Sequence, residues 1–310
     1  MFEATFTHTV IAPFRLDLTV WVLRRRQKNI IDMWDGQRYT RILMLFNLPI
    51  KLTVFLLPVS PNRETKQLLI SLQCYKQLSV DQQAEVVAIT QKMLGLAVDV
   101  QPFYELASRN QTLEQLTKQY VGVRPPRFPT VFEALINAVA CQQVSLDVGI
   151  LLLNRLSEKY GMEFKVNTGI MHAFPRPEDL LDEPEGNLKQ LGFSYQKARA
   201  IKEIAYIAAN DGLQLEELEA VNNDDIVAKL QAIRGIGRWS AEYVLLRGLG
   251  RLEVFPGDEI GGQNNIQKLL GLNARPTYDE LKKHTDAWHP YAGFVYFHLL
   301  LTKLHEKGMV

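Results

Sequence analysis

The sequence is poor in the residues that build metal centres and crosslinks. It has 310 residues but only two cysteines, Cys74 and Cys141, which lie far apart along the chain. Two thiols are too few for an all-thiolate zinc site or an iron–sulfur cluster, and they do not suggest a disulfide-built secreted domain. The six histidines show no spacing typical of metal ligands. We therefore expect neither an iron–sulfur cluster nor a thiolate zinc site.

The chain also lacks a strong net charge and a long apolar run. Thirty-five Lys and Arg residues against 34 Asp and Glu leave a formal charge of +1, so affinity for a polyanion depends on where the charges lie. The longest apolar stretch, residues 42–59, is interrupted by Asn47, Pro49 and Lys51, which excludes a membrane-spanning helix. No basic segment precedes an apolar one at the N-terminus, so we expect a cytoplasmic protein.

The length suffices for about two globular domains, and the first part has the pattern of a small antiparallel sheet. Apolar residues alternate over residues 14–22 and 41–46 and, after a turn at 47–49, over residues 50–56, with a further strand possible over 68–74. One face of such a sheet needs a cover. A helix that opens with a capping box, Ser79 with Gln82, can supply it.

Beyond that helix the apolar period stays near 3.6, which is typical of helices. The proline-rich segment 124–129 precedes a helix expected to begin near Thr130, and further helices are expected over residues 187–210, 224–233, 239–249, 260–270, 277–288 and 290–306. Thr277 and Glu280 form a second capping box. The sequence predicts an α+β protein, with a β-rich N-terminal domain over residues 1–98 and an all-α domain over residues 99–310.

The most informative segment is residues 224–250, DDIVAKLQAIRGIGRWSAEYVLLRGLG. A short helix ends in the turn Gly235-Ile236-Gly237, and a second helix opens at Arg238. The two glycines let the backbone approach a ligand closely, and the free N–H groups at the start of the second helix suit a phosphate. Between residues 229 and 251 five basic residues stand against one acidic residue, which is typical of an element that binds a nucleic-acid backbone. Such a turn can also be a plain connection between helices, so the next segment is decisive.

That segment, RLEVFPGDEIGGQNNIQ over residues 251–267, follows the hairpin directly. Together the two segments resemble the helix-hairpin-helix-GPD superfamily of DNA glycosylases, in which a Gly/Pro-rich loop ending in a catalytic aspartate follows the hairpin. The similarity is strongest to the 3-methyladenine DNA glycosylase II branch, whose N-terminal domain is a TATA-box-binding-protein-like antiparallel sheet. The resemblance implies a monomer that binds double-stranded DNA, flips a damaged base out of the duplex and hydrolyses its N-glycosidic bond.

The acidic loop departs from the family pattern. The resemblance places the catalytic aspartate at position 259, where this chain has Glu259, directly after Asp258. Either Glu259 is the catalytic carboxylate with one extra methylene, or Asp258 acts after a one-residue shift of the loop, or the chain is an impaired member that still binds DNA. Acidic residues in a first helical turn also simply complement the helix dipole. We expect Glu259 at the catalytic position, with weakened activity, and Asp258 as the alternative.

The resemblance also implies a base pocket. Trp239 and Tyr243 are four residues apart and so lie on one helix face. Two such aromatics are ordinarily core residues, but the resemblance places both in the pocket, where their rings can stack on an electron-poor alkylated purine. Leu300 stands where some members have a further pocket tryptophan. Bifunctional relatives carry a lysine at the position of Trp239, so the resemblance implies a monofunctional enzyme that uses water.

Further DNA contacts follow from the resemblance. Gln143, within AVACQQVS over residues 138–145, matches the residue that fills the gap left by the flipped nucleotide, although a solvated helix end would look the same. Contacts with the DNA backbone are expected from Arg234, Gly235, Ile236, Gly237, Arg238 and Ser240. The backbone carbonyls of Gln231, Ile233 and Ile236 are expected to bind a monovalent cation, and no other cofactor is expected.

The sequence therefore predicts a monofunctional DNA glycosylase that excises alkylated purines in base excision repair and leaves an abasic site. Two alternatives remain open at this point. The lesion can instead be an oxidised or deaminated base, or the chain can be a non-catalytic protein that binds damaged duplex, as Glu259 suggests. The expected setting is a bacterial-type cytoplasm, in association with the nucleoid.

Overall fold

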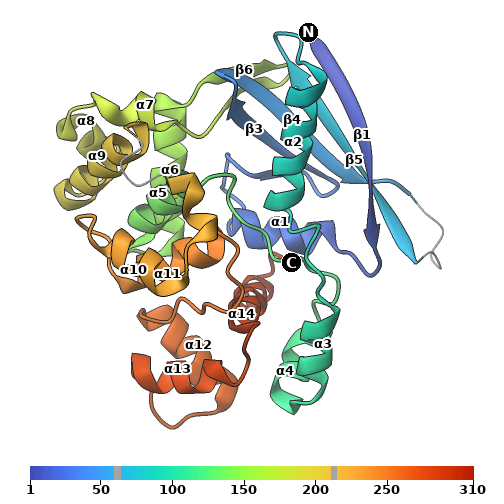
Figure 1. Cartoon of the computed structure of the whole chain (residues 1–310), viewed down its shortest axis with the longest axis vertical. Helices are drawn as coiled ribbons and strands as arrows, with labels where there is room; N and C mark the ends of the chain where they lie inside the picture. Colours follow the sequence, from blue (N-terminus) through green and yellow to red (C-terminus); the bar gives the residue numbers. More distant parts are fainter. Residues whose placement is uncertain (59–63, 211–214) are drawn as a thin grey trace.

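The computed structural model describes residues 1–58, 64–210 and 215–310 and shows a β-sheet followed by a mainly helical part (Figure 1). The sheet has five antiparallel strands in the order β1-β5-β4-β3-β2. Their bounds are Phe2–Ile11 (β1), Met33–Trp34 (β2), Arg38–Leu45 (β3), Leu48–Leu56 (β4) and Thr65–Cys74 (β5). The predicted N-terminal antiparallel sheet is confirmed, although the prediction did not include β1.

The predicted hairpin is formed by β3 and β4. Phe46 and Asn47 connect the two strands with φ values of 55° and 56°, the left-handed conformation that a two-residue type I′ turn requires. Ile50, Leu52 and Val54 occupy every second position of β4, all point into the core and are fully buried. The period of two in the sequence therefore identified the buried face of this strand correctly.

The predicted cover of the sheet is α2 (Val80–Met93), which lies across one face (Figure 1). It begins with the expected capping box, in which the Gln82 N–H donates to the Ser79 hydroxyl and the Ser79 N–H donates to Oε1 of Gln82. Val86 and Met93 are fully buried in the same core as the inner residues of the strands. The helix thus removes one face of the sheet from water.

The predicted strand over residues 14–22 is wrong, because this segment forms α1 (Leu16–Arg24). Val20 packs into the core of the sheet, whereas Leu18 and Val22 pack into the core of the C-terminal helices. Because α1 lies between two cores, apolar residues at successive even positions all find a partner, with Leu16 and Val20 in one core and Leu18 and Val22 in the other. The apolar residues of this helix therefore alternate along the sequence as those of a strand do.

The second part of the chain is built mainly from helices. They are α3 Gln101–Ser108, α4 Gln111–Lys118, α5 Val131–Cys141, α6 Leu146–Tyr160, α7 Pro177–Leu181, α8 Glu185–Gln190, α9 Tyr195–Ala209, a 3₁₀ turn Leu215–Ala220, α10 Asn223–Gln231, α11 Arg238–Arg247, α12 Ile260–Leu270, α13 Tyr278–Asp286 and α14 Ala292–Glu306. The expected starts near Thr130 and at the Thr277 capping box are confirmed.

Two details differ from the prediction for this part. A two-stranded hairpin, β6 (Glu163–Val166) with β7 (Gly169–His172), interrupts the helices, so the second part is not purely helical. The single helix expected over residues 187–210 is divided into α8 and α9. Gly192, with φ at +106°, lies in the turn between them, a conformation that only glycine adopts easily.

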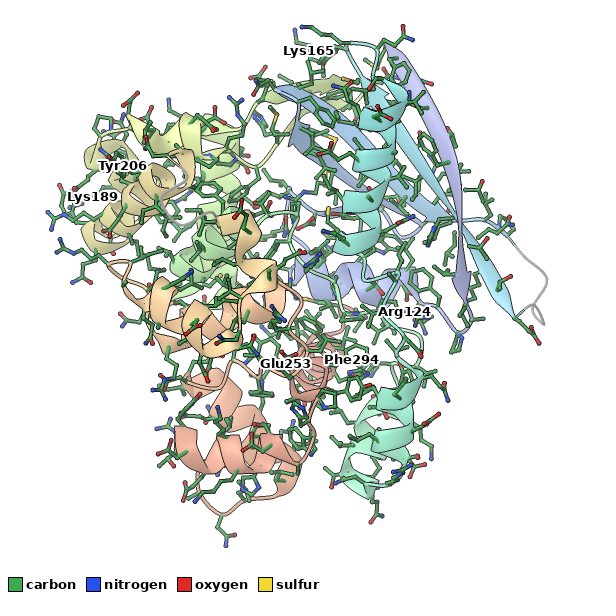
Figure 2. The ribbon with its side chains drawn as sticks, in the orientation of Figure 1. Arg124, Lys165, Lys189, Tyr206, Glu253 and Phe294 are labelled. Atoms are coloured by element: carbon green, nitrogen blue, oxygen red, sulfur yellow. The ribbon has the colours of Figure 1, made fainter. Side chains whose placement is uncertain are left out.

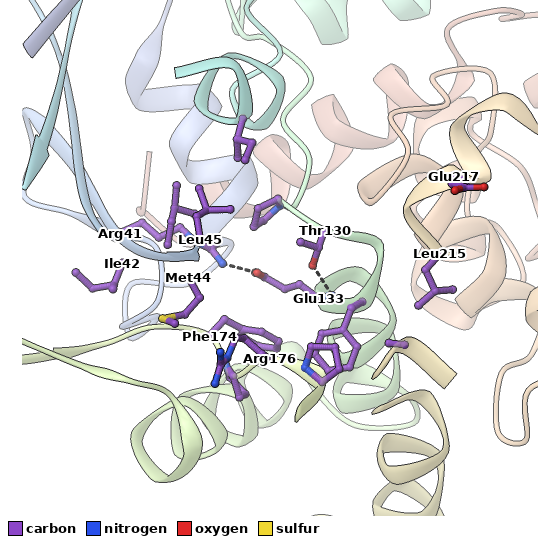
Figure 3. A pocket seen from close by; sticks show the side chains of 17 residues that line it. Arg41, Ile42, Met44, Leu45, Thr130, Glu133, Phe174, Arg176, Leu215 and Glu217 are labelled. Carbon is purple, nitrogen blue, oxygen red and sulfur yellow. Dashed lines mark hydrogen bonds and ion pairs between the residues drawn. The ribbon is translucent and has the colours of Figure 1, made fainter. Parts of the chain in front are cut away.

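Buried ion pairs join the sheet to the helices. Arg41 of β3 donates to Asp32 at 2.9 Å and to Glu133 of α5, and Tyr39 donates to the same aspartate at 2.7 Å. A cavity of about 410 Å³ beside these residues is lined largely by apolar side chains (Figure 3). Because Arg41 and Glu133 already bind each other, this cavity offers a ligand mainly apolar contacts.

The packing of the helices separates a surface from an interior. Figure 2 shows Lys189 and Tyr206 on the outer side of α8 and α9, whereas Phe294 of α14 lies among the helices, where it is fully buried. None of the helices in the described ranges has the length and apolar character needed to cross a membrane.

Candidate active site

A cavity of about 1110 Å³ lies between the hairpin of α10 and α11 and the acidic loop before α12. Its other walls are the turn from α5 to α6 and the start of α9. The predicted site residues that line it are Gln143, Arg234, Gly235, Gly237, Arg238, Trp239, Ser240, Asp258 and Glu259. The fold therefore gathers the residues predicted to bind phosphate, to hold the base, to fill the gap and to supply the carboxylate around one cavity.

The hairpin presents an open helix N-terminus to this cavity. Gly235 has a φ of +86°, which favours glycine. Gly237 is the N-cap of α11, and no described side chain caps this helix, so the N–H groups of its first turn are available to a ligand. A Cβ atom at Gly237 would meet no atom within 4 Å, so glycine here keeps the approach open. With Arg234 and Arg238 exposed beside it, this terminus is suited to a phosphate.

The two predicted pocket aromatics contact each other with tilted rings, at 5.2 Å between ring centroids and 32° between planes. Trp239 is half-buried and lines the cavity, whereas Tyr243 is 3% exposed and lies behind it. The Tyr243 hydroxyl accepts a hydrogen bond of 2.8 Å from Arg25, at the C-terminal end of α1. Burial raises the pKa of this phenol, so it is neutral at physiological pH. The indole is therefore the aromatic face that a base can reach.

The two acidic residues of the loop have different surroundings. Asp258 is exposed, whereas Glu259 is half-buried at the start of α12, where its Oε1 accepts the Gly262 N–H at 3.1 Å. Burial raises the pKa of Glu259, partly offset by this hydrogen bond and by Lys303. A Cβ atom at Gly261 would come within 2.9 Å of the same oxygen. The extra methylene of glutamate is thus folded into space that a glycine leaves free.

The turn between α5 and α6 carries Gln143 on an exposed, left-handed backbone with φ at 53°. The neighbouring Gln142 holds this turn against the hairpin, because its amide donates to the Gly235 carbonyl at 2.8 Å and to the Ser240 hydroxyl at 2.7 Å. Lys197 of α9 donates to the carbonyl of Ala140 at the end of α5. The sequence analysis did not identify Gln142 or Lys197. Their contacts lie 57 to 98 residues away along the chain, so no local pattern reveals them.

Five predicted residues do not line the cavity, namely Gln231, Ile233, Ile236, Tyr243 and Leu300. Ile236 is buried and anchors the hairpin in the core, Tyr243 lies behind the indole, and Leu300 is half-buried against the core of the C-terminal helices. The carbonyl of Ile233 accepts the N–H of Ile236 at 3.1 Å, as a tight turn requires. Within the described ranges no group of three or more His, Cys, Asp or Glu side chains could hold a metal ion. Cation binding by the carbonyls of Gln231, Ile233 and Ile236 stays a prediction.

Comparison with known proteins places this site in a family. Residues 136–290 match the model of the HhH-GPD superfamily of base excision DNA repair proteins, and the chain belongs to this superfamily. The matched segment contains Gln143, the hairpin, Trp239 and the acidic loop. The predicted class of protein is therefore confirmed.

Individual relatives agree with this assignment. The DNA-3-methyladenine glycosylase of Bacillus subtilis is 31% identical over 215 residues, which cover 69% of this chain and 71% of the relative. DNA-3-methyladenine glycosylase 1 of Schizosaccharomyces pombe is 31% identical over 60% of this chain and 79% of its own length. The solved 3-methyladenine DNA glycosylase from Archaeoglobus fulgidus superposes over the full length of both chains with a TM-score of 0.80 at 23% identity. This superposition extends the shared fold to the N-terminal sheet.

Proposed function

We propose that this protein is a monofunctional DNA glycosylase that excises alkylated purines of the 3-methyladenine type from double-stranded DNA in base excision repair. The observation that carries the proposal is the position of Glu259, a half-buried carboxylate in one cavity with Trp239 and an open helix N-terminus. The names of the relatives support the alkylated purine as substrate. The protein acts as a monomer in the cytoplasm.

The proposed reaction begins with binding and base flipping. Backbone N–H groups at the start of α11, with Arg234 and Arg238, bind phosphates and fix the register of the duplex. The damaged nucleotide rotates into the cavity, and Gln143, exposed at its turn, fills the gap with hydrogen bonds to the orphaned base. Trp239 stacks on the flipped purine, and a positive charge on an alkylated base strengthens this contact.

Glu259 then stabilises the positive charge that develops on the deoxyribose as the base departs. Breaking the N-glycosidic bond develops positive charge on the deoxyribose, and an anion fixed beside it lowers the barrier. A water molecule adds to the sugar, so the products are the free base and an abasic site. Position 239 holds an indole, which cannot form a Schiff base, and the ammonium of Lys197 is engaged by the Ala140 carbonyl. Both features favour hydrolysis over lyase chemistry.

The test is a panel of defined duplexes that carry 3-methyladenine, 7-methylguanine, hypoxanthine or 8-oxoguanine. The wild type is expected to release the methylated purines. Glu259→Gln is expected to abolish release while Asp258→Asn retains it, because Asp258 is exposed, whereas Glu259 is half-buried and held at the start of α12 by the Gly262 N–H. Tight binding to abasic-site duplex without release of any base, together with release by Glu259→Asp, would instead identify a damage-binding protein. Loss of release in Asp258→Asn alone would assign the chemistry to the other carboxylate.

A further inference from the structure

A second carboxylate lies beneath the acidic loop and has no part in the proposed chemistry. Glu242 is on α11, three residues after Trp239, and is 7% exposed. Its Oε2 accepts the backbone N–H of Gly257 at 3.3 Å, and its Oε1 accepts the hydroxyl of Tyr278 from α13. Two donors on two different segments thus converge on one buried carboxylate. A buried anion with this partner set costs desolvation energy, which the two hydrogen bonds offset.

The loop held in this way has little room to move. A Cβ atom at Gly257 would lie 2.4 Å from a methyl carbon of Leu281 on α13, so the loop backbone is packed directly against that helix. Gly257 is two residues before Glu259. The hydrogen bond at the Gly257 N–H therefore restrains the backbone two peptide units before the proposed catalytic carboxylate.

The same carboxylate is connected to the hairpin. The guanidinium of Arg238 lies over the ring of Tyr278, 4.7 Å from its centroid, and the Tyr278 hydroxyl donates to Glu242. Arg238 lines the cavity beside the open N-terminus of α11. A continuous set of contacts thus runs from the residue proposed to meet a DNA phosphate, through Tyr278 and Glu242, to the backbone of the acidic loop.

We propose that Glu242 is a positioning residue for the acidic loop, and that Tyr278 links its hold on Gly257 to phosphate binding at Arg238. The proposal rests on the proposed function for the role of Glu259. Occupation of Arg238 by a phosphate would then stabilise the loop in the arrangement that excision requires.

Hydrogen exchange of the loop tests this proposal without depending on activity. The probe is a duplex with a tetrahydrofuran abasic-site analogue, and the readout is exchange in residues 252–262 of the wild type, Glu242→Gln and Tyr278→Phe. An amide at position 242 has one acceptor oxygen in place of two and lacks the charge that strengthens both hydrogen bonds, so we expect exchange of this segment about tenfold faster than in the wild type. Adding the duplex should slow loop exchange in the wild type and slow it less in Tyr278→Phe.

The second readout is single-turnover excision at saturating enzyme. Glu242→Gln should lower the rate constant about tenfold, with an unchanged reaction amplitude and an abasic-duplex Kd within about threefold of the wild type. A merely structural role would lower the amplitude and leave the rate constant of the folded fraction unchanged. The matched control is Tyr160→Phe, which removes a similar tyrosine hydrogen bond, 3.0 Å to Glu183, away from the cavity, and should change neither readout.

Unchanged loop exchange in both Glu242→Gln and Tyr278→Phe would overturn the proposal, whatever the excision rates. If the wild type releases no base, the proposed function fails while the exchange data still decide whether Glu242 holds the loop. Should Glu242→Gln fold poorly, Tyr278→Phe decides, because it removes one hydroxyl from a partly exposed side chain.

Discussion

Alanine at position 261 is expected to slow base excision while making the protein slightly more stable. Gly261 is the second residue of α12, and the Glu259 side chain folds back over it to accept the Gly262 N–H. A Cβ atom there would lie 2.9 Å from Oε1 of Glu259, whereas ordinary contact begins at 3.4 Å. The carboxylate must therefore retreat by about 0.5 Å.

The size of the effect follows from that displacement. A misplacement of ~1 Å costs ~100-fold in rate, so ~0.5 Å corresponds to about tenfold, or ~1.4 kcal/mol of activation free energy. Alanine also favours a helix over glycine by up to ~1 kcal/mol, and by less in the first turn. Rate and stability should therefore change in opposite directions, which general damage to the fold cannot produce. Single-turnover release of 7-methylguanine measures the first quantity, and thermal denaturation measures the second.

The control is Gly186→Ala, because Gly186 is also the second residue of a helix and a Cβ atom there would meet nothing within 4 Å. It should raise stability without changing the rate. In a Glu259→Asp background the shorter side chain frees the contested space, so adding alanine at 261 should cost less than it does in the wild type. Excision by Gly261→Ala within about twofold of the wild type would show that the carboxylate does not act from this position.

Four further predictions concern pH, the buried ion pairs between the sheet and the helices, and DNA binding. Burial raises the pKa of Glu259, and the proposed reaction needs its anion. The excision rate should therefore fall with decreasing pH at a higher pH than an exposed glutamate would give, and an acid limb at the ordinary value contradicts this. Burial lowers the pKa of His298 to about 4. The unfolded state therefore binds the proton first, and the free energy of unfolding should fall by up to ~1.4 kcal/mol per pH unit as pH drops from about 6.5 towards 4, a slope that His298→Phe should reduce. Arg41→Ala leaves two buried carboxylates unpaired and should lower the free energy of unfolding, measured by urea denaturation, by ~3–5 kcal/mol; a loss below ~1 kcal/mol would show that the pairs contribute little. Arg234→Ala should weaken binding to all duplexes alike and reduce the slope of log K against log salt by about one; an unchanged slope would exclude a phosphate contact.

Local sequence patterns predicted the elements that have one buried face. The β3–β4 hairpin, the cap of α2 and the start of α5 each depend on residues within a few positions of one another, so their signals are contained in short windows. Helix α1 was mistaken for a strand because it is buried from two sides, and that circumstance depends on the tertiary structure. The alternating pattern of β1 includes Ala4 and His8 on its inner face and is too weakly apolar to stand out.

The candidate site likewise contains residues that local sequence predicted and contacts that arise only on folding. The hairpin and the acidic loop are contiguous in sequence, so their residues could be predicted together. The sequence analysis favoured Glu259 over Asp258 from the resemblance alone, and no local pattern could predict that the Glu259 side chain turns back over Gly261. The contacts of Arg25 with Tyr243 join positions 218 residues apart. Nothing in the sequence near either partner indicates such a pair, since burial and distance arise only on folding.

The contacts of Arg25 tie the N-terminal segment to the helices that form the candidate active site. Its guanidinium binds both Tyr243 and Asn137 from the end of α1, with the backbone in a left-handed conformation at φ 61°. A fragment that begins after α1 would keep every residue proposed to meet DNA, yet the Tyr243 hydroxyl behind the indole would lose its hydrogen bond from Arg25. A smaller enzyme engineered from this chain would therefore have to retain α1 and Arg25, or carry another cation that donates to Tyr243 and Asn137.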